Sequence, residues 1–206
     1  TTGAAAAPGV HLVLTGEDTP LPYGILPVSQ DEHPLARDRV RFVGDPVAAV
    51  IADTEEQAEA ALARIAVDYE PLPTIADPEE ALSTPAPRIH DYGDIGNVHK
   101  MVALDFGDVD AALASADRVF EDVFFYEGNT HLAIEQHATL ATLEPDGRLA
   151  VHSSTQTPHY LHRALAKALA LPPHRIRVVA VPNGGGFGGK SDPFNHEIVG
   201  AKAALL

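Results

Sequence analysis

The strongest constraint on the fold is a glycine-rich segment near the end of the chain. Residues 183–197 read NGGGFGGKSDPFNHE, so five glycines occupy six positions around Phe187. Glycine adopts positive φ angles and lets backbone N–H groups come close to a ligand, whereas five glycines are an entropic cost that a plain turn does not need. Residues 176–181 predict a strand before the loop, and a helix is expected to begin near Asp192 or Pro193. A strand, a glycine loop and a helix N-terminus form an anion-binding geometry, so we expect an anionic ligand here.

One interpretation of this segment is a nucleotide-binding P-loop. Residues 184–191 satisfy the pattern G-x-x-x-x-G-K-[ST], in which backbone amides and Lys190 hold phosphates and Ser191 binds Mg²⁺. Only 15 residues follow Ser191, which leaves no second strand with a magnesium-binding Asp. The upstream strands also form no evident βαβ series. The P-loop is therefore the less favoured interpretation, and its ligand would be a nucleoside triphosphate with magnesium.

The charge and cysteine content exclude several classes of function. The chain has 206 residues with 29 Asp+Glu against 14 Lys+Arg, a formal net charge of −15, which argues against binding to nucleic acid or anionic membranes. It has no cysteine, so disulfides, thiolate zinc sites, iron–sulfur clusters and cysteine nucleophiles are absent from it. Any redox chemistry must use a cofactor held by other groups. No membrane span or secretory signal is visible, and we expect a cytoplasmic protein.

The pattern along the chain predicts an α+β fold in two parts. The first part, residues 1–82, has β-branched runs that predict four strands, at 10–14, 40–43, 47–51 and 65–69. A helix is predicted over 54–65, with Thr54 and Gln57 as a capping box, and a short one over 78–82. Residues 83–98 lack periodicity and predict a linker.

The second part, residues 99–206, contains the glycine loop. Strands are predicted at 118–126, 139–143 and 149–152, and a short helix at 109–114. Residues 158–169 repeat apolar side chains at intervals of three and four, which predicts a helix that ends at Pro172 and Pro173.

Two motifs in this second part occur together in a known family. The segment Ser154-Thr155-Gln156 lies 28 residues before Gly184, and residues 184–190 read GGGFGGK. In this order and spacing they resemble the molybdenum hydroxylases, the relatives of xanthine dehydrogenase and aldehyde oxidase. The resemblance covers nearly the whole chain, because four further segments are similar to the same family: 41–53 (RFVGDPVAAVIAD), 66–73 (AVDYEPLP), 107–117 (GDVDAALASAD) and 131–141 (HLAIEQHATLA).

The resemblance implies a fold and a domain order. Residues 1–82 would be an α/β hammerhead domain without its first strands, and 99–206 the N-terminal part of the first molybdopterin-binding domain. The chain would then be a piece of a longer subunit. The family's catalytic base, a glutamate, would lie beyond Leu206, so no base can be named in this chain.

The resemblance also implies the site residues. Gln156 matches a glutamine whose amide donates to an oxo ligand of molybdenum, and Phe187 with Gly185, Gly186 and Gly188 matches positions that approach the metal and the pterin. Gln156 and Phe187 would lie beside the metal without being its direct ligands. Ser191 stands where the xanthine-oxidising branch carries a glutamate, which makes a purine substrate doubtful and Ser191 a candidate substrate-binding residue.

A cofactor, partners and a reaction follow from the same resemblance. The cofactor would be a molybdenum-pterin, in the molybdopterin cytosine dinucleotide form, with iron–sulfur clusters and FAD on partner subunits of a hetero-oligomer. The text KSDPFNHE is most similar to the α subunit of 4-hydroxybenzoyl-CoA reductase, which implies reductive dehydroxylation to benzoyl-CoA. The alternatives are another molybdenum hydroxylase, acting on an aldehyde, an N-heterocycle or CO, and a non-catalytic assembly module.

Two histidine-containing clusters give weaker signals. His131, Glu135 and His137 have the spacing H-x3-E-x-H, which differs from the helical H-E-x-x-H of zinc sites. We expect Glu135 to have a structural role beneath the cofactor loop. His159 and His162 lie three apart on the predicted helix and are expected to be packed or exposed side chains.

Overall fold

The computed structural model describes residues 1–24, 30–83, 86–91, 93 and 95–206. The chain divides into two compact units, one made of Thr1–Thr74 with His131–Leu206 and the other of Ile75–Thr130. Residues 84–85, 92 and 94 of the predicted linker lie outside the described residues. Each unit is described by itself below, and among the described residues no helix is long and apolar enough to span a membrane.

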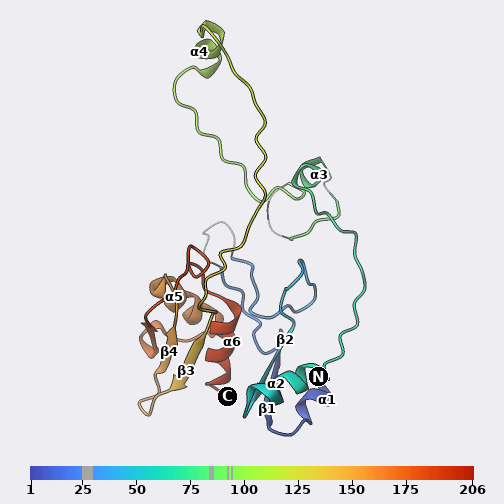
Figure 1. Ribbon diagram of the computed structural model, residues 1–206, viewed down its shortest axis with the longest axis vertical. Coiled ribbons are helices and arrows are strands. Elements are labelled where there is room, and N and C mark those ends of the chain that lie inside the picture. The colour runs from blue at the N-terminus through green and yellow to red at the C-terminus, as the bar shows by residue number, and fades with distance from the viewer. Residues whose placement is uncertain (25–29, 84–85, 92, 94) are drawn as a thin grey trace. The chain divides into compact units, whose positions relative to one another are not determined.

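The N-terminal part of the first unit is a two-stranded antiparallel sheet with two helices (Figure 1). Its elements are α1 (Thr2–Ala5), β1 (Val10–Thr15), β2 (Ala48–Ala52) and α2 (Glu55–Leu62). Helix α2 begins where the sequence predicts it. The Thr54 hydroxyl accepts a hydrogen bond from the Gln57 N–H, and the Gln57 side chain accepts one from the Thr54 N–H, which confirms the capping box. Ala4 and Ala61 are fully buried where the two helices meet the sheet.

The C-terminal part of this unit is a three-stranded sheet covered by helices. Its elements are β3 (Thr139–Leu143), β4 (Leu149–Ser153), α5 (Pro158–Ala168), the 3₁₀ turn η1 (Pro173–Arg175), β5 (Ile176–Ala180) and α6 (Asn195–Ala203). The strand order is β3-β4-β5, with β3 antiparallel to β4 and β4 parallel to β5. Leu161 and Leu165 of α5 are fully buried in one cluster with Val151 of β4 and Ile198 of α6. The periodicity of residues 158–169 is confirmed as the buried face of α5.

The parallel pairing of β4 and β5 determines where the two motifs lie. Strand β4, helix α5 and strand β5 form a βαβ unit, since a crossover is needed to make two neighbouring strands parallel. The residues that follow β4 include Gln156, and those that follow β5 form the glycine loop, so both segments begin at the carboxyl ends of the two parallel strands. Open α/β sheets bind ligands at the carboxyl ends of their strands.

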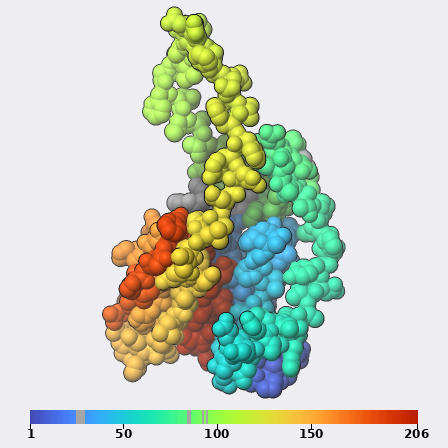
Figure 2. Space-filling view, in the orientation of Figure 1, coloured from blue at the N-terminus to red at the C-terminus, as the bar shows by residue number. Residues whose placement is uncertain are grey.

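The second unit has two short helices and extended segments. Helix α3 spans Pro78–Ser83, and α4 spans Val109–Ser115 with the Asp108 carboxylate capping its first turn. None of its described residues is buried. Figure 2 shows the yellow-green segment around α4 as a thin loop. The aromatic residues Phe124 and Phe125 are 90% and 91% exposed.

Three predicted strands, at 40–43, 65–69 and 118–126, are wrong, because the structure describes all three segments and none of them forms a strand. Their β-branched and aromatic residues favour an extended backbone, but a strand also needs a neighbour to complete its hydrogen bonds. Val43, at 104% exposure, illustrates the absence of such a neighbour among the described residues. The expectation that no βαβ series precedes the glycine loop is also wrong, since β4, α5 and β5 form one.

Candidate functional site

The glycine loop has a backbone that most residues cannot adopt. Gly185 and Gly188 have φ angles of +115° and +89°, so both need glycine. Phe187 between them is also left-handed, with φ of +52°, and the residue is 74% exposed. A positive φ at a bulky residue is strained, and such strain is concentrated at ligand-binding sites.

Side chains lie close against the other three glycines. A Cβ atom on Gly184 would be 2.9 Å from the Glu135 Cβ, and one on Gly189 would be 2.8 Å from the His131 Cγ. A Cβ on Gly186 would be 2.5 Å from the Gln156 Oε1. The five glycines thus have two physical causes, positive φ at two positions and close approach of a side chain at three.

The hydrogen bonds within the loop leave three consecutive N–H groups without an acceptor. The Gly185 N–H donates to the Asn183 Oδ1 at 2.9 Å, and the Gly189 N–H donates to the Gly186 carbonyl at 2.7 Å. Among the described residues, no acceptor is present for the N–H groups of Gly186, Phe187 and Gly188. Unpaired backbone donors of this kind are able to bind the oxygen atoms of an anionic ligand.

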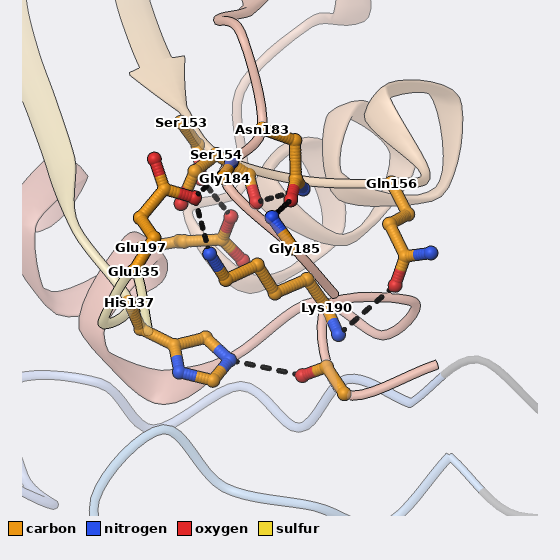
Figure 3. A network of polar contacts seen from close by, with 11 residues as sticks. Glu135, His137, Ser153, Ser154, Gln156, Asn183, Gly184, Gly185, Lys190 and Glu197 are labelled. Carbon is orange, nitrogen blue, oxygen red and sulfur yellow. Dashed lines mark hydrogen bonds and ion pairs between the residues drawn. The ribbon is translucent and has the colours of Figure 1, made fainter. Parts of the chain in front are cut away.

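The side chain of Gln156 is held by its carbonyl end (Figure 3). Its Oε1 accepts hydrogen bonds from the Lys190 N–H at 3.3 Å and from the Ser191 hydroxyl at 3.2 Å. A backbone N–H can only donate, so this contact fixes which end of the amide faces the loop. The NH₂ group of Gln156 therefore points away from the Lys190 N–H, and it has no acceptor within the described chain.

Three hydrogen bonds to backbone carbonyl groups join the segment after β4 to the loop. The Gln156 N–H donates to the Lys190 carbonyl at 2.8 Å, and the Thr157 hydroxyl donates to the Ser191 carbonyl at 2.7 Å. The Asn183 amide donates to the Ser154 carbonyl at 3.0 Å. The structure therefore brings the two sequence motifs together, and it places Ser191 against Gln156.

Lys190 is directed into the protein. Its side chain is 2% exposed, and its Nζ lies 2.5 Å from the Glu135 Oε2. The hydrogen bond from Lys190, followed by that from the Gly184 N–H, lowers the pKa of Glu135 below its ordinary value, so the carboxylate stays charged. A P-loop lysine must instead reach the terminal phosphates of its nucleotide. The geometry of Lys190 therefore disfavours the P-loop interpretation, and α6 begins only at Asn195.

A buried carboxylate, that of Glu197, lies beneath the loop. It is 2% exposed, its Oε1 accepts a hydrogen bond from the Ser153 hydroxyl at 2.5 Å, and its Oε2 accepts one from the Phe194 N–H at 2.8 Å. Burial raises the pKa of Glu197, while these two hydrogen bonds oppose the rise. Sequence reasoning missed this contact, although a glutamate three residues after the N-cap of a helix is a signal for a cap.

The histidines beneath the loop contact the protein itself. His137 Nε2 lies 2.9 Å from the Gly189 carbonyl, and its ring packs edge-on against Phe194 and His196. Burial and, secondarily, the charge of His137 lower the pKa of His196 to about 4. No group of three or more metal-ligating side chains occurs among the described residues, and His131, Glu135 and His137 each contact the loop instead.

The fold brings a glycine loop with three unpaired backbone donors beside Gln156, and comparison with known proteins gives the family of the chain. The molybdopterin cofactor-binding domain matches residues 89–206, and the a/b hammerhead domain of aldehyde oxidase and xanthine dehydrogenase matches residues 1–73. The chain therefore belongs to the xanthine dehydrogenase and aldehyde oxidase family of molybdopterin-binding proteins. The predicted domain limits at 82 and 99 stay predictions.

Similar proteins of known activity support the same assignment. The large molybdopterin subunit of nicotinate dehydrogenase from Eubacterium barkeri is 40% identical over 189 residues, covering 92% of this chain and 44% of the relative. The molybdenum-binding subunit of xanthine dehydrogenase from Escherichia coli O157:H7 is 34% identical over 199 residues, covering 92% of this chain and 26% of the relative. The structure of quinoline 2-oxidoreductase from Pseudomonas putida 86 matches with a TM-score of 0.85 at 31% identity, covering 99% of this chain and 27% of that chain. The chain thus spans less than half the length of these relatives.

Proposed function

We propose that this chain supplies part of the molybdenum-cofactor site in the catalytic subunit of an oxidoreductase. The observation that carries the proposal is the set of four neutral donors without acceptors among the described residues: the N–H groups of Gly186, Phe187 and Gly188, and the NH₂ group of Gln156. Gly185 contributes its positive φ rather than a donor, because its N–H is bonded to Asn183.

The donor set suits the oxygen-rich ligands of a molybdenum-pterin cofactor. Amide N–H groups are neutral and do not titrate, so they hold negatively charged oxygen atoms in one orientation at any working pH. When bound, the cofactor would supply the two-electron chemistry. The chain's own contribution is orientation: Lys190 and Ser191 hold the Gln156 carbonyl oxygen, and the amide nitrogen is thereby directed outward.

We propose two candidate substrate classes, and Ser191 bears on both. The first is reductive dehydroxylation of 4-hydroxybenzoyl-CoA, supported by the local text KSDPFNHE. The second is hydroxylation of an N-heterocycle, supported by the similarity to nicotinate dehydrogenase and quinoline 2-oxidoreductase. In either case position 191 presents a hydroxyl in place of a carboxylate, which argues against a purine.

The substrate classes are separated by assaying the complete complex. Turnover of 4-hydroxybenzoyl-CoA with a low-potential reductant supports the first class, and turnover of nicotinate or quinoline with a dye acceptor supports the second. An aldehyde and CO are assayed alongside, since they are the remaining alternatives.

The proposal includes partner subunits that carry iron–sulfur clusters and FAD, because this chain has no cysteine with which to bind a cluster. It also includes the cytosine dinucleotide form of the cofactor and a cytoplasmic location. Mass spectrometry of the purified complex identifies the partners, and acid release identifies the nucleotide. An intact complex without molybdenum would favour the assembly-module alternative.

The replacement Gln156→Ala in the complete enzyme tests the role of the amide. We expect kcat to fall about 10²-fold or more, because a preorganised donor at the reacting centre is lost. Gln30→Ala is the matched control, since the Gln30 side chain accepts a hydrogen bond from Lys167 of α5 and lies outside the loop. An unchanged kcat in Gln156→Ala at normal molybdenum content would contradict the assignment.

A further inference from the structure

Glu135 reaches both ends of the glycine loop with one atom. Its Oε2 accepts a hydrogen bond from the Gly184 N–H at 2.9 Å and pairs with the Lys190 Nζ at 2.5 Å. Gly184 and Lys190 are the first and last residues of the GGGFGGK segment. Figure 3 shows the carboxylate of Glu135 between these two groups.

Glu135 also packs closely against the backbone of the loop. Gly184 has no side chain, and a Cβ there would lie 2.9 Å from the Glu135 Cβ, so the loop backbone rests directly on the glutamate. Lys190 is 2% exposed, and Glu135 is its only ion-pair partner in the described chain. A buried ammonium group requires such a partner, and Lys190 is therefore anchored where Glu135 is.

The ion pair between Glu135 and Lys190 affects the hydrogen-bond donors of the site. The Lys190 N–H is one of the two groups that hold Gln156, and the unpaired N–H groups of Gly186, Phe187 and Gly188 lie between the two anchored ends. We propose that Glu135 is the positioning residue of this loop: by joining its two ends through one carboxylate oxygen, it fixes the loop amides and, through Lys190, the amide of Gln156. This inference deepens the proposed function and rests on it for the identity of the ligand.

Hydrogen exchange at the loop amides that are bonded within the protein, those of Gly184, Gly189 and Lys190, measures loop order without depending on the ligand. In the complete complex, millisecond exchange into D₂O is followed in peptides that cover residues 183–191, and in peptides from α5 as an internal reference. Glu135→Gln keeps the shape of the side chain but removes its charge, and Glu135→Asp keeps the charge but shortens the reach. Both are expected to speed exchange in the loop by about 10-fold relative to wild type and to leave α5 within about 2-fold.

Two further variants make the test specific. Glu144→Gln is the matched control, because Glu144 pairs with Arg148 near the β3–β4 turn and does not contact the loop. The double variant Glu135→Gln/Lys190→Met removes both charges of this ion pair, and it should show the same fast loop exchange even if Glu135→Gln alone fails to fold. Loop exchange unchanged in these Glu135 variants, or accelerated equally in α5, would overturn the proposal.

Molybdenum content supplies the second readout. Wild type and Glu144→Gln should retain the metal, whereas Glu135→Gln should lose it at least about 5-fold faster in mild urea. If wild type holds no molybdenum, the proposed function fails while the exchange result still decides the role of Glu135. If wild type holds molybdenum and Glu135→Gln loses it at the wild-type rate, the positioning role fails and the proposed function stands.

Discussion

The replacement Gly186→Ala tests the geometry of the site most sharply. A Cβ at this position would lie 2.5 Å from the Gln156 Oε1 and 2.6 Å from its Cδ, whereas ordinary contacts begin at 3.4 Å. The glutamine side chain must therefore move by about 1 Å, because it is more flexible than the loop backbone. Gly186 has no positive φ, so alanine itself adds no backbone strain.

The magnitudes for Gly186→Ala differ between stability and activity. Displacing Gln156 breaks two neutral hydrogen bonds, each contributing about 0.5–1.5 kcal/mol, and the gain from restricting the unfolded chain offsets about 0.4–1 kcal/mol of that loss. The net change in the free energy of unfolding is therefore about 2.6 kcal/mol at most. A displacement of about 1 Å at a reacting centre costs about 10²-fold in rate. We expect kcat to fall about 10²-fold in a complex that remains folded.

The assay combines kcat, molybdenum content and thermal unfolding of the complete complex. Gly128→Ala is the control, because a Cβ on Gly128 meets no described atom within 4 Å. In a Gln156→Ala background, Gly186→Ala should cause little further loss, since the clashing side chain is gone. A wild-type kcat in Gly186→Ala with normal molybdenum would refute the reasoning.

Two further predictions concern the groups beneath the loop. Ser153→Ala removes the donor to the buried Glu197 carboxylate and should lower the free energy of unfolding by about 1–3 kcal/mol in urea titrations, and a loss below about 0.5 kcal/mol would contradict the contact. The pKa of His196 is lowered from 6.5 to about 4 in the folded state, so the unfolded chain binds the proton first and stability falls as pH drops from about 6.5 toward 4. His196→Asn should flatten this part of the pH profile by about 1–2 kcal/mol, with partial exposure limiting the effect, and parallel profiles for the two proteins would contradict it.

Local signals predicted much of the fold. The capping box at Thr54 and the apolar spacing in residues 158–169 depend on neighbours three or four residues away, and both are confirmed. The strand prediction at 118–126 failed because strand structure depends on hydrogen bonds to a distant partner, which composition does not encode. The βαβ unit was missed for the same reason, since the direction of β4 relative to β5 is a tertiary property.

The sequence allowed the motifs of the site to be predicted, but it did not allow the contacts between their side chains to be predicted. Spacing and resemblance pointed to Gln156 and the glycine loop, and the structure brings them together. The expectation that Glu135 lies against the loop is confirmed, whereas its bridge between residues 49 and 55 positions away is a detail that no local pattern indicates. The pattern at Lys190 suggested a phosphate ligand, but burial of its side chain depends on a glutamate that lies far away in the sequence.

The central claim is that this chain holds a molybdenum-pterin cofactor against the glycine loop and Gln156. The most direct test is the metal content of the complex purified from its native host with this subunit as bait, measured by mass spectrometry together with the nucleotide released by acid. We predict near-stoichiometric molybdenum with a cytosine nucleotide. An intact complex that contains no molybdenum, above all one with bound ATP and magnesium, would contradict the claim.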